Sequence, residues 1–240
     1  MKDLTTDAFF NGRITIKQSR SGYRFSIDAV LLAAHVKLGP TDTVVDLGTG
    51  CGIISIVLAF QNPTVTVCGI EIQKTLADIA ALNVKENCLA HRVHVICGDM
   101  KTLGPEILPD PADMVVSNPP YRVARSGRIN PNRQRAKARH EITVTLSEVV
   151  QAAQQMLRTA GKFAMIYPAD RITDVLNHMR SNALEPKFLR TIHSRMNTEA
   201  KLILVEGVKG GRPGLKIAPP LTIYGEDGSY TQEVQEMFER

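Results

Sequence analysis

The sequence predicts an α/β fold in which a mainly parallel sheet carries helices on both faces. Two observations support this prediction. Short runs rich in β-branched residues alternate with longer segments of helical periodicity, which is the pattern of parallel strands joined by crossover helices. The first of these runs ends in a glycine-rich turn, where an open α/β sheet commonly binds its ligand.

Each expected strand is a short apolar run bounded by polar or turn-forming residues. These runs cover residues 43–47, 65–70, 93–97, 113–117, 162–167 and 201–208. Residues 74–87 place apolar side chains at helical spacing and predict a covering helix. Residues 146–161 predict a second one, which ends at Gly161, a residue suited to a helix C-cap.

The chain is expected to form one domain with additions at both ends. With 240 residues, 43% of them hydrophobic, it can bury a substantial core. Residues 1–40 are interpreted as an N-terminal extension that packs on the core, 41–208 as the core, and 209–240 as an irregular tail of the same domain. No internal repeat or long linker divides them.

Composition points to a globular protein, which we expect to be cytoplasmic. The apolar runs are too short to span a membrane, and the first twenty residues are too polar for a secretory signal. The net charge of +5 indicates only a mildly basic surface.

The cysteines are predicted to be reduced structural thiols. Cys51, Cys68, Cys88 and Cys97 show neither a CxxC motif nor zinc-ligand spacing, so no metal site is expected. Cys68 and Cys97 fall within runs that we interpret as buried strands.

The segment VVDLGTGCG, residues 44–52, carries the first chemical signal. Its glycines let the backbone approach a ligand at the carboxyl end of a strand. Ile53 stands where a dinucleotide-binding fingerprint has its third glycine. Asp46 would repel a pyrophosphate, but it suits a ligand that carries an ammonium and a sulfonium.

Two further acidic residues follow the next strands. Glu71 closes the second strand, where a carboxylate can accept hydrogen bonds from both hydroxyls of a ribose. Asp99 follows the third strand, where its side chain can reach the amino group of an adenine; taken alone, it is almost as well interpreted as a helix N-cap.

The fourth strand ends in SNPPYR, residues 117–122. The side chain of Asn118 and the backbone carbonyl of Pro119 can accept hydrogen bonds from an amine, while Pro119 and Pro120 bring no competing N–H group. Tyr121 supplies a ring on which a flat base can stack. We interpret the motif as a clamp for an amide or an aromatic amine; the alternative is an ordinary turn after a strand.

A strongly basic run follows this motif. Residues 122–140 contain six arginines, one lysine and no acidic residue. Such a run is often a solvated face, but its place beside the clamp favours contact with nucleic acid. The arginines expected to make this contact are Arg122, Arg125, Arg128, Arg133, Arg135 and Arg139.

At Asp46, the glycine loop, Glu71 and Asp99, the chain resembles the class I S-adenosylmethionine-dependent methyltransferases. The resemblance implies a Rossmann-like, seven-stranded, mainly parallel sheet whose last strand is antiparallel. NPPY resembles the (D/N/S)PP(Y/F) motif of amino-methyltransferases. That motif occurs in enzymes that act on adenine in DNA or RNA, on guanine N2 in ribosomal RNA, or on glutamine N5 of release factors.

A second resemblance covers most of the chain. Its parts are residues 22–35, 117–122, 139–143 and 204–234, and they look like the bacterial tRNA methyltransferases that modify adenine N6 in valine tRNA beside the anticodon. This implies RNA as substrate, S-adenosylmethionine as cofactor and no metal. By the same resemblance, residues 25–33 cover the cofactor near its methionine end and make Asp28 a candidate for that wall, although it could equally cap a helix.

The expected function is therefore methylation of adenine N6 in RNA, and the expected RNA substrate is a tRNA. The expected catalytic residues are Asn118, Pro119, Pro120 and Tyr121. The expected cofactor contacts are Asp28, Asp46, Gly48, Thr49, Gly50, Glu71, Ile72, Asp99, Met100 and Asn118. Alternatives are a protein glutamine methyltransferase, a guanine-N2 methyltransferase of ribosomal RNA, and an RNA-binding protein with a vestigial cofactor site; a dehydrogenase fits the loop less well.

Overall fold

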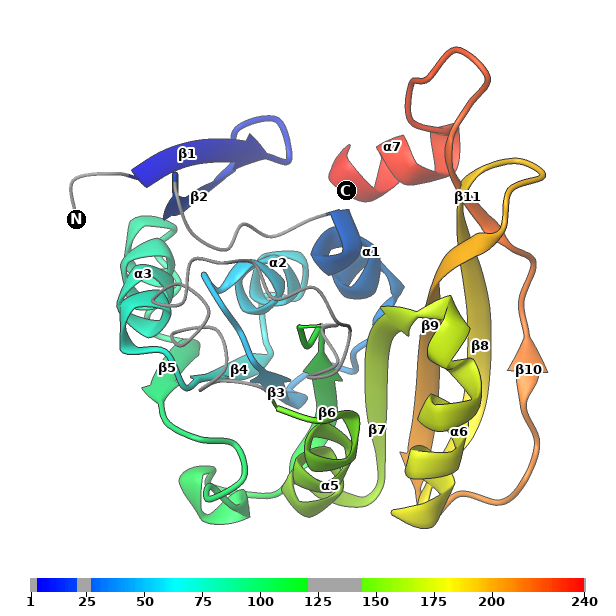
Figure 1. The fold of residues 1–240 in the computed structure, drawn as a ribbon. Helices are drawn as coiled ribbons and strands as arrows, with labels where there is room; N and C mark the ends of the chain where they lie inside the picture. Colours follow the sequence, from blue (N-terminus) through cyan, green and yellow to red (C-terminus); the bar gives the residue numbers. More distant parts are fainter. Residues whose placement is uncertain (1–3, 21–26, 121–143, 240) are drawn as a thin grey trace, which may run out of the picture.

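The structure, a computed structural model, describes residues 4–20, 27–120 and 144–239. Its centre is a nine-stranded sheet (Figure 1). Seven of the strands form the continuous order β5-β4-β3-β6-β7-β9-β8. Their bounds are β3 Thr43–Leu47, β4 Thr66–Glu71, β5 Val93–Cys97, β6 Ala112–Ser117, β7 Leu157–Pro168, β8 Leu184–Arg195 and β9 Ala200–Lys209.

Strand directions confirm the predicted class. β3 pairs in parallel with β4 and β6, and β6 pairs in parallel with β7, whereas β9 is antiparallel to both of its neighbours, β7 and β8. Two short strands not predicted from the sequence, β10 (Lys216–Ile217) and β11 (Leu221–Tyr224), extend the sheet beyond β8. Since β3 has β4 on one side and β6 on the other, the strand order reverses there, and a crevice forms at the carboxyl ends of these strands.

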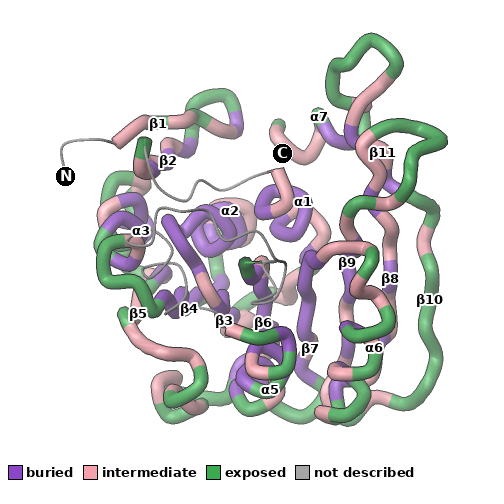
Figure 2. Tube along the Cα trace, in the orientation of Figure 1, coloured by how far each residue is buried: buried purple, intermediate pink, exposed green. Residues whose placement is uncertain are grey.

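Helices cover both faces of the sheet (Figures 1 and 2). One face carries α1 (Ile27–His35), α2 (Ile53–Gln61) and α3 (Lys74–Glu86). The other carries α5 (Leu146–Met156) and α6 (Ile172–Ser181). Each face of the sheet packs against its helices in a separate hydrophobic core, and alternate residues of β3 point into the two cores. Val44 packs in the core with α1 and α2, and Val45 in the core with α5 and α6. This burial on both sides explains why the central strands are continuously apolar.

Two predictions about individual residues are wrong: the helix C-cap at Gly161 and the burial of Cys97. The helix expected to end at Gly161 ends at Met156, and β7 begins immediately after it. Its last carbonyls are capped by Lys209, whose Nζ donates to the carbonyl oxygens of Gln154 and Leu157 at 2.7 Å each. Gly161 instead lies at a crowded place in β7, because a β-carbon there would lie 2.9 Å from the carbonyl oxygen of Arg158 and 3.1 Å from that of Ala112 on β6.

Cys97 is exposed rather than buried, because β5 is the edge strand of the sheet. Cys51 and Cys68 are buried, Cys88 is exposed, and all four are free thiols.

The N-terminal segment forms a hairpin that packs against α3. β1 (Leu4–Phe9) and β2 (Ile14–Ser19) pair with each other in antiparallel register. The outer edge of β2 is satisfied by the side chains of Asn83, in α3, and of Asn87, which directly follows that helix. Asn83 accepts from the backbone N–H of Lys17 and donates to its carbonyl oxygen, both at 2.8 Å. Asn87 does the same for Thr15 at 3.0 and 2.8 Å.

The segment after β9 is more regular than expected. Besides β10 and β11 it contains α7 (Gln232–Glu239), which Arg190 of β8 anchors through two hydrogen bonds to Glu233 at 2.7 and 2.9 Å. Two short 3-10 helices, η1 (Pro105–Ile107) and η2 (Ala169–Arg171), complete the described elements. None of the helices in the described ranges is both long and apolar enough to cross a membrane.

Candidate cofactor and acceptor site

A cavity opens at the carboxyl ends of β3, β4 and β6, where the strand order reverses. Most of the residues predicted for the site line it: Gly48, Gly50, Glu71, Ile72, Asp99, Met100, Asn118, Pro119 and Pro120. Its wall also includes side chains that the sequence analysis did not single out as site residues: Leu47, Gln73, Leu76, Lys101 and Val144. Residues distant in sequence thus meet at one opening of the sheet.

The glycine loop forms the floor of this cavity. Gly48 and Gly50 adopt φ values of 77° and 59°, a left-handed conformation that favours glycine. The backbone N–H groups of Gly48 and Thr49 donate to the carbonyl oxygen of Ile70 at 2.9 and 3.0 Å, which folds the loop onto β4. A β-carbon on Gly48 would have no atom closer than 3.9 Å, so its conformation, and not crowding, requires glycine.

Asp46 lies beneath the loop and does not line the cavity. It is fully buried, and its Oδ2 accepts from the hydroxyls of Thr49 at 2.6 Å and Ser55 at 2.8 Å. Its Oδ1 is buried and has no hydrogen-bond partner within the described part of the chain. Burial raises the pKa of Asp46 to about 6, although the two hydroxyls lower it in part. Asp46 therefore holds the loop in place from below through Thr49, and neither residue lines the cavity.

Glu71 stands at the cavity wall with its carboxylate already oriented. The side chain is buried, and its two oxygens accept from the backbone N–H groups of Gln73 at 2.8 Å and Gly50 at 3.1 Å. Burial raises its pKa. The Gln73 side chain and the Ile72 backbone also form hydrogen bonds with it, which lower the pKa in part. Because Glu71 lines the cavity, its carboxylate can also accept from the hydroxyls of a ligand.

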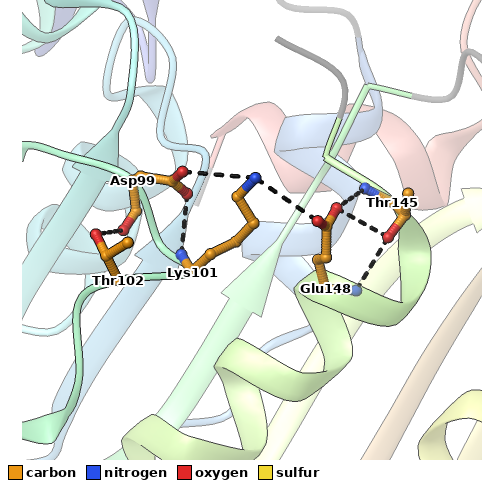
Figure 3. Close-up of polar contacts among 5 residues, drawn as sticks. All are labelled: Asp99, Lys101, Thr102, Thr145 and Glu148. Atoms are coloured by element: carbon orange, nitrogen blue, oxygen red, sulfur yellow. Dashed lines mark hydrogen bonds and ion pairs between the residues drawn. The ribbon is translucent and has the colours of Figure 1, made fainter.

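Asp99 lies in a turn after β5, and no helix begins there, so the N-cap interpretation is wrong. Its Oδ1 accepts from the backbone N–H of Lys101 at 3.0 Å, and its carbonyl oxygen accepts from Thr102 (Figure 3). The ammonium of Lys101 lies 3.6 Å from the other carboxylate oxygen of Asp99. Ile72, 44% exposed, presents an apolar surface on the same cavity.

The acceptor motif begins directly after β6. Ser117, the last residue of the strand, is buried and its hydroxyl donates to the carbonyl oxygen of Leu47 at 2.8 Å. This bond fixes the end of β6 against the end of β3. Asn118, Pro119 and Pro120 follow and line the cavity. Tyr121 and the six arginines predicted to bind RNA lie outside the described residues.

Asp28 lies in the first turn of α1 and is not part of the cavity wall. Within residues 4–20, 27–120 and 144–239, no three His, Cys, Asp or Glu side chains are grouped closely enough to hold a metal ion.

Comparison with known proteins identifies the family. The sequence profile described as methyltransferase small domain matches residues 21–185. A tRNA1(Val) (adenine(37)-N6)-methyltransferase of Porphyromonas gingivalis is 32% identical over 85% of this chain and 81% of its own. A protein of the same name from Erwinia tasmaniensis is 26% identical over 95% of this chain and 91% of its own.

Solved structures agree on the fold. A predicted O-methyltransferase from Agrobacterium tumefaciens superposes with a TM-score of 0.70 at 21% identity, covering 88% of this chain and 94% of its own. Geranyl diphosphate methyltransferase in complex with SAM superposes with a TM-score of 0.53 at 14% identity, covering 75% and 84%. The predicted Rossmann-like class I fold is confirmed.

The profile match spans more than half of the chain, and the Porphyromonas relative matches it over most of both lengths. The chain therefore belongs to the methyltransferase small domain family, among the tRNA1(Val) (adenine(37)-N6)-methyltransferases, and its methyl donor is S-adenosylmethionine.

Proposed function

We propose that this enzyme methylates the exocyclic N6 of an adenine in tRNA. The observation that carries the proposal is the position of Asn118, Pro119 and Pro120 on the wall of the cavity that also holds the glycine loop and Glu71. An acceptor motif for a planar amine thus adjoins the cofactor residues. The relatives named above act, by their names, on adenine 37 of a valine tRNA.

The residues of the cavity fit S-adenosylmethionine. Glu71 lines the cavity with a carboxylate that can accept from the two ribose hydroxyls, and Asp99 offers a carboxylate to the adenine amino group. Ile72 and Met100 supply apolar surface for the ring, and the glycines at 48 and 50 leave room for the methionine portion. When bound, the cofactor supplies an electrophilic methyl group on a sulfonium.

The clamp acts on the amine that receives the methyl group. The lone pair of an adenine N6 is delocalised into the ring, so the free amine is a weak nucleophile. If the side-chain oxygen of Asn118 and the carbonyl oxygen of Pro119 accept its two N–H groups, the nitrogen can pyramidalise and direct its lone pair at the methyl group. The two prolines stiffen this segment and add no competing donor.

No strong general base is needed for this step. The amine becomes acidic only after the methyl group has arrived, and water can then take the proton. Asn118 and Pro119 favour the reaction because N–H groups on a nitrogen that is becoming positive are stronger donors. Their contribution therefore grows toward the transition state.

Two features favour RNA over the other acceptors of this motif. The relatives are tRNA methyltransferases, and the sequence after Pro120 carries six arginines within residues 122–140. Arginine pairs with phosphate through two parallel hydrogen bonds. A glutamine side chain of a protein would not require such a run. We therefore propose that these arginines contact the tRNA backbone.

The test is methyl transfer from labelled S-adenosylmethionine to three acceptors: valine tRNA, ribosomal RNA and a release factor. We expect label in the tRNA alone, and none when adenine 37 is replaced by guanine. Label in the release factor or in ribosomal guanine would contradict the proposed acceptor.

Variants of the motif test the clamp. Asn118→Ala is expected to slow single-turnover transfer by at least roughly 10²-fold with little change in tRNA affinity, as for deletion of one preorganised hydrogen-bonding group. Tyr121→Ala is expected to weaken base capture by roughly 1–3 kcal/mol of stacking, whereas Tyr121→Phe keeps the ring and serves as its matched control. A folded Asn118→Ala enzyme with the wild-type rate would refute the clamp.

A further inference from the structure

Lys101 joins the cofactor cavity to a helix outside it. Its side chain lines the cavity, and its ammonium lies 3.6 Å from Asp99 Oδ2 and 3.6 Å from Glu148 Oε1 (Figure 3). Asp99 belongs to the turn after β5, whereas Glu148 lies in the first turn of α5. One cation therefore lies between a carboxylate of the cavity and a carboxylate that does not touch it.

The position of Glu148 is fixed by the start of its own helix. Its Oε2 accepts from the backbone N–H of Thr145 at 2.7 Å and from the Thr145 hydroxyl at 2.9 Å, in a capping box. Only Oε1 faces Lys101. The bond from the Thr145 N–H is the main reason that the pKa of Glu148 is lowered, with a further contribution from Lys101, so Glu148 is ionised at neutral pH.

This arrangement leaves one oxygen of Asp99 available. Oδ1 is engaged by the Lys101 N–H, but Oδ2 lies 3.6 Å from the ammonium, which is an ion-pair distance and too long for a hydrogen bond. Without Glu148, the flexible lysine chain could close onto Oδ2 and occupy the position that a ligand amine would take. Without Lys101, Asp99 would lose the cation that pairs with it in the described part of the chain.

We propose that Lys101, held in place by Glu148, is a positioning residue that gives the cofactor site its preference for adenine. It places a cation beside Asp99 while leaving Oδ2 free to accept from the adenine amino group. This inference rests on the proposed role of Asp99 in the cofactor site. The pairs are 30–44% exposed, and such pairs add little to stability. Bound adenine shields these pairs from water, which lowers the local dielectric constant and strengthens the interaction between the charges.

The experiment measures selectivity and not affinity alone. Calorimetry gives the dissociation constants of S-adenosylhomocysteine and of its hypoxanthine analogue, which replaces the ring amine by a carbonyl. Wild type is expected to prefer the adenine compound, and Asp99→Asn to lose that preference. Lys101→Met and Glu148→Gln are each expected to reduce the preference by about fivefold, the effect of one such ion pair.

Glu148→Gln is an informative substitution because glutamine also completes a capping box, so α5 keeps its N-terminus while the charge disappears. Because Glu148 acts through Lys101, the double variant should match Lys101→Met alone. Asp78→Asn is the matched control: it breaks the exposed Lys74–Asp78 pair, 3.0 Å long, on α3 beside the cavity and should leave the preference unchanged.

The experiment distinguishes failure of the proposed role of Asp99 from failure of the proposed role of Lys101. If wild type shows no preference for the adenine compound, the role of Asp99 is wrong, and the inference falls with it. If wild type prefers adenine, Asp99→Asn abolishes the preference, and both Lys101→Met and Glu148→Gln retain it, then Lys101 does not position Asp99 and only the further inference is overturned. Additive effects in the double variant would likewise overturn the action of Glu148 through Lys101.

Discussion

Replacing Asp46 by asparagine should stabilise this protein at neutral pH and remove part of its pH dependence. Asp46 is fully buried, and burial raises its pKa from the ordinary value of 3.8 to about 6. Each pKa unit corresponds to ~1.4 kcal/mol, so keeping the ionised form in the folded protein at pH 7 costs about 3 kcal/mol. The asparagine oxygen can take the place of Oδ2 and accept from the hydroxyls of Thr49 and Ser55. Its NH2 group then takes the place of Oδ1, as the O–H of the protonated carboxyl does, so the variant resembles the protonated wild type and lacks only the charge.

The sign follows from proton binding. Between pH 4 and pH 6 the folded protein binds more protons at Asp46 than the unfolded chain does, so this group makes the free energy of unfolding fall as pH rises through that window. Asp46→Asn lacks this dependence. The variant should match wild type near pH 4 and exceed it in unfolding free energy by up to about 3 kcal/mol at pH 7.

Urea denaturation of both proteins at pH 4, 5, 6 and 7 measures this difference. Asp113→Asn is the control with the opposite sign. Burial also opposes ionisation of Asp113, but hydrogen bonds from the Thr43 N–H and Arg158 outweigh it and lower its pKa. Loss of that carboxylate should destabilise the protein at pH 7. A wild-type to Asp46→Asn difference that stays constant from pH 4 to pH 7 would show that Asp46 does not carry the costly charge.

Further predictions concern the cofactor, the tRNA and a helix end. Glu71→Ala should weaken S-adenosylmethionine binding by roughly 10- to 100-fold in calorimetry. An unchanged dissociation constant would show that Glu71 does not bind the ribose hydroxyls of the cofactor. Lys209→Met should lower the free energy of unfolding by roughly 1–3 kcal/mol, because the carbonyls of α5 lose their cap, while cofactor affinity stays constant; equal stability in urea would argue against the cap. Replacing four arginines by glutamine should reduce the slope of log K for tRNA binding against log salt concentration by up to about 0.7–0.9 per lost phosphate contact. An unaltered slope would show that the arginine run faces solvent and does not contact the tRNA. The four are Arg125, Arg128, Arg133 and Arg135.

The central strands could be predicted because their environment is simple. β3 and β5 begin and end where the apolar runs 43–47 and 93–97 do. β8 was not predicted because a strand near the edge of the sheet needs fewer apolar positions: many of its residues are only half-buried, and Pro186, Lys187 and Arg190 interrupt the pattern. The helix α6 was missed for a similar reason, since only Val175 and Met179 on it are buried.

The cavity residues were predictable where they follow a strand. Glu71, Asp99 and Asn118 come at or just after strand ends, and parallel strands bring such positions to one edge. Lys101 and Val144 line the same cavity, but nothing in the sequence around them signals it, because loops place them there. Asp46 also belongs to a strand that ends at the cavity, but it is buried under the glycine loop and does not line the cavity, which its place in the sequence does not reveal.

The side-chain amides of Asn83 and Asn87, which bind the N-terminal hairpin, mean that removal of this hairpin would affect other parts of the protein. Asn83 serves the hairpin and also donates from Nδ2 to the carbonyl oxygen of Cys51, in the glycine loop, at 2.9 Å. This one buried carboxamide thus joins the hairpin, α3 and the floor of the cofactor cavity. Deleting residues 1–20 would leave its oxygen without the Lys17 N–H and free the side chain to turn. An engineer who trims this protein would then be altering its cofactor loop.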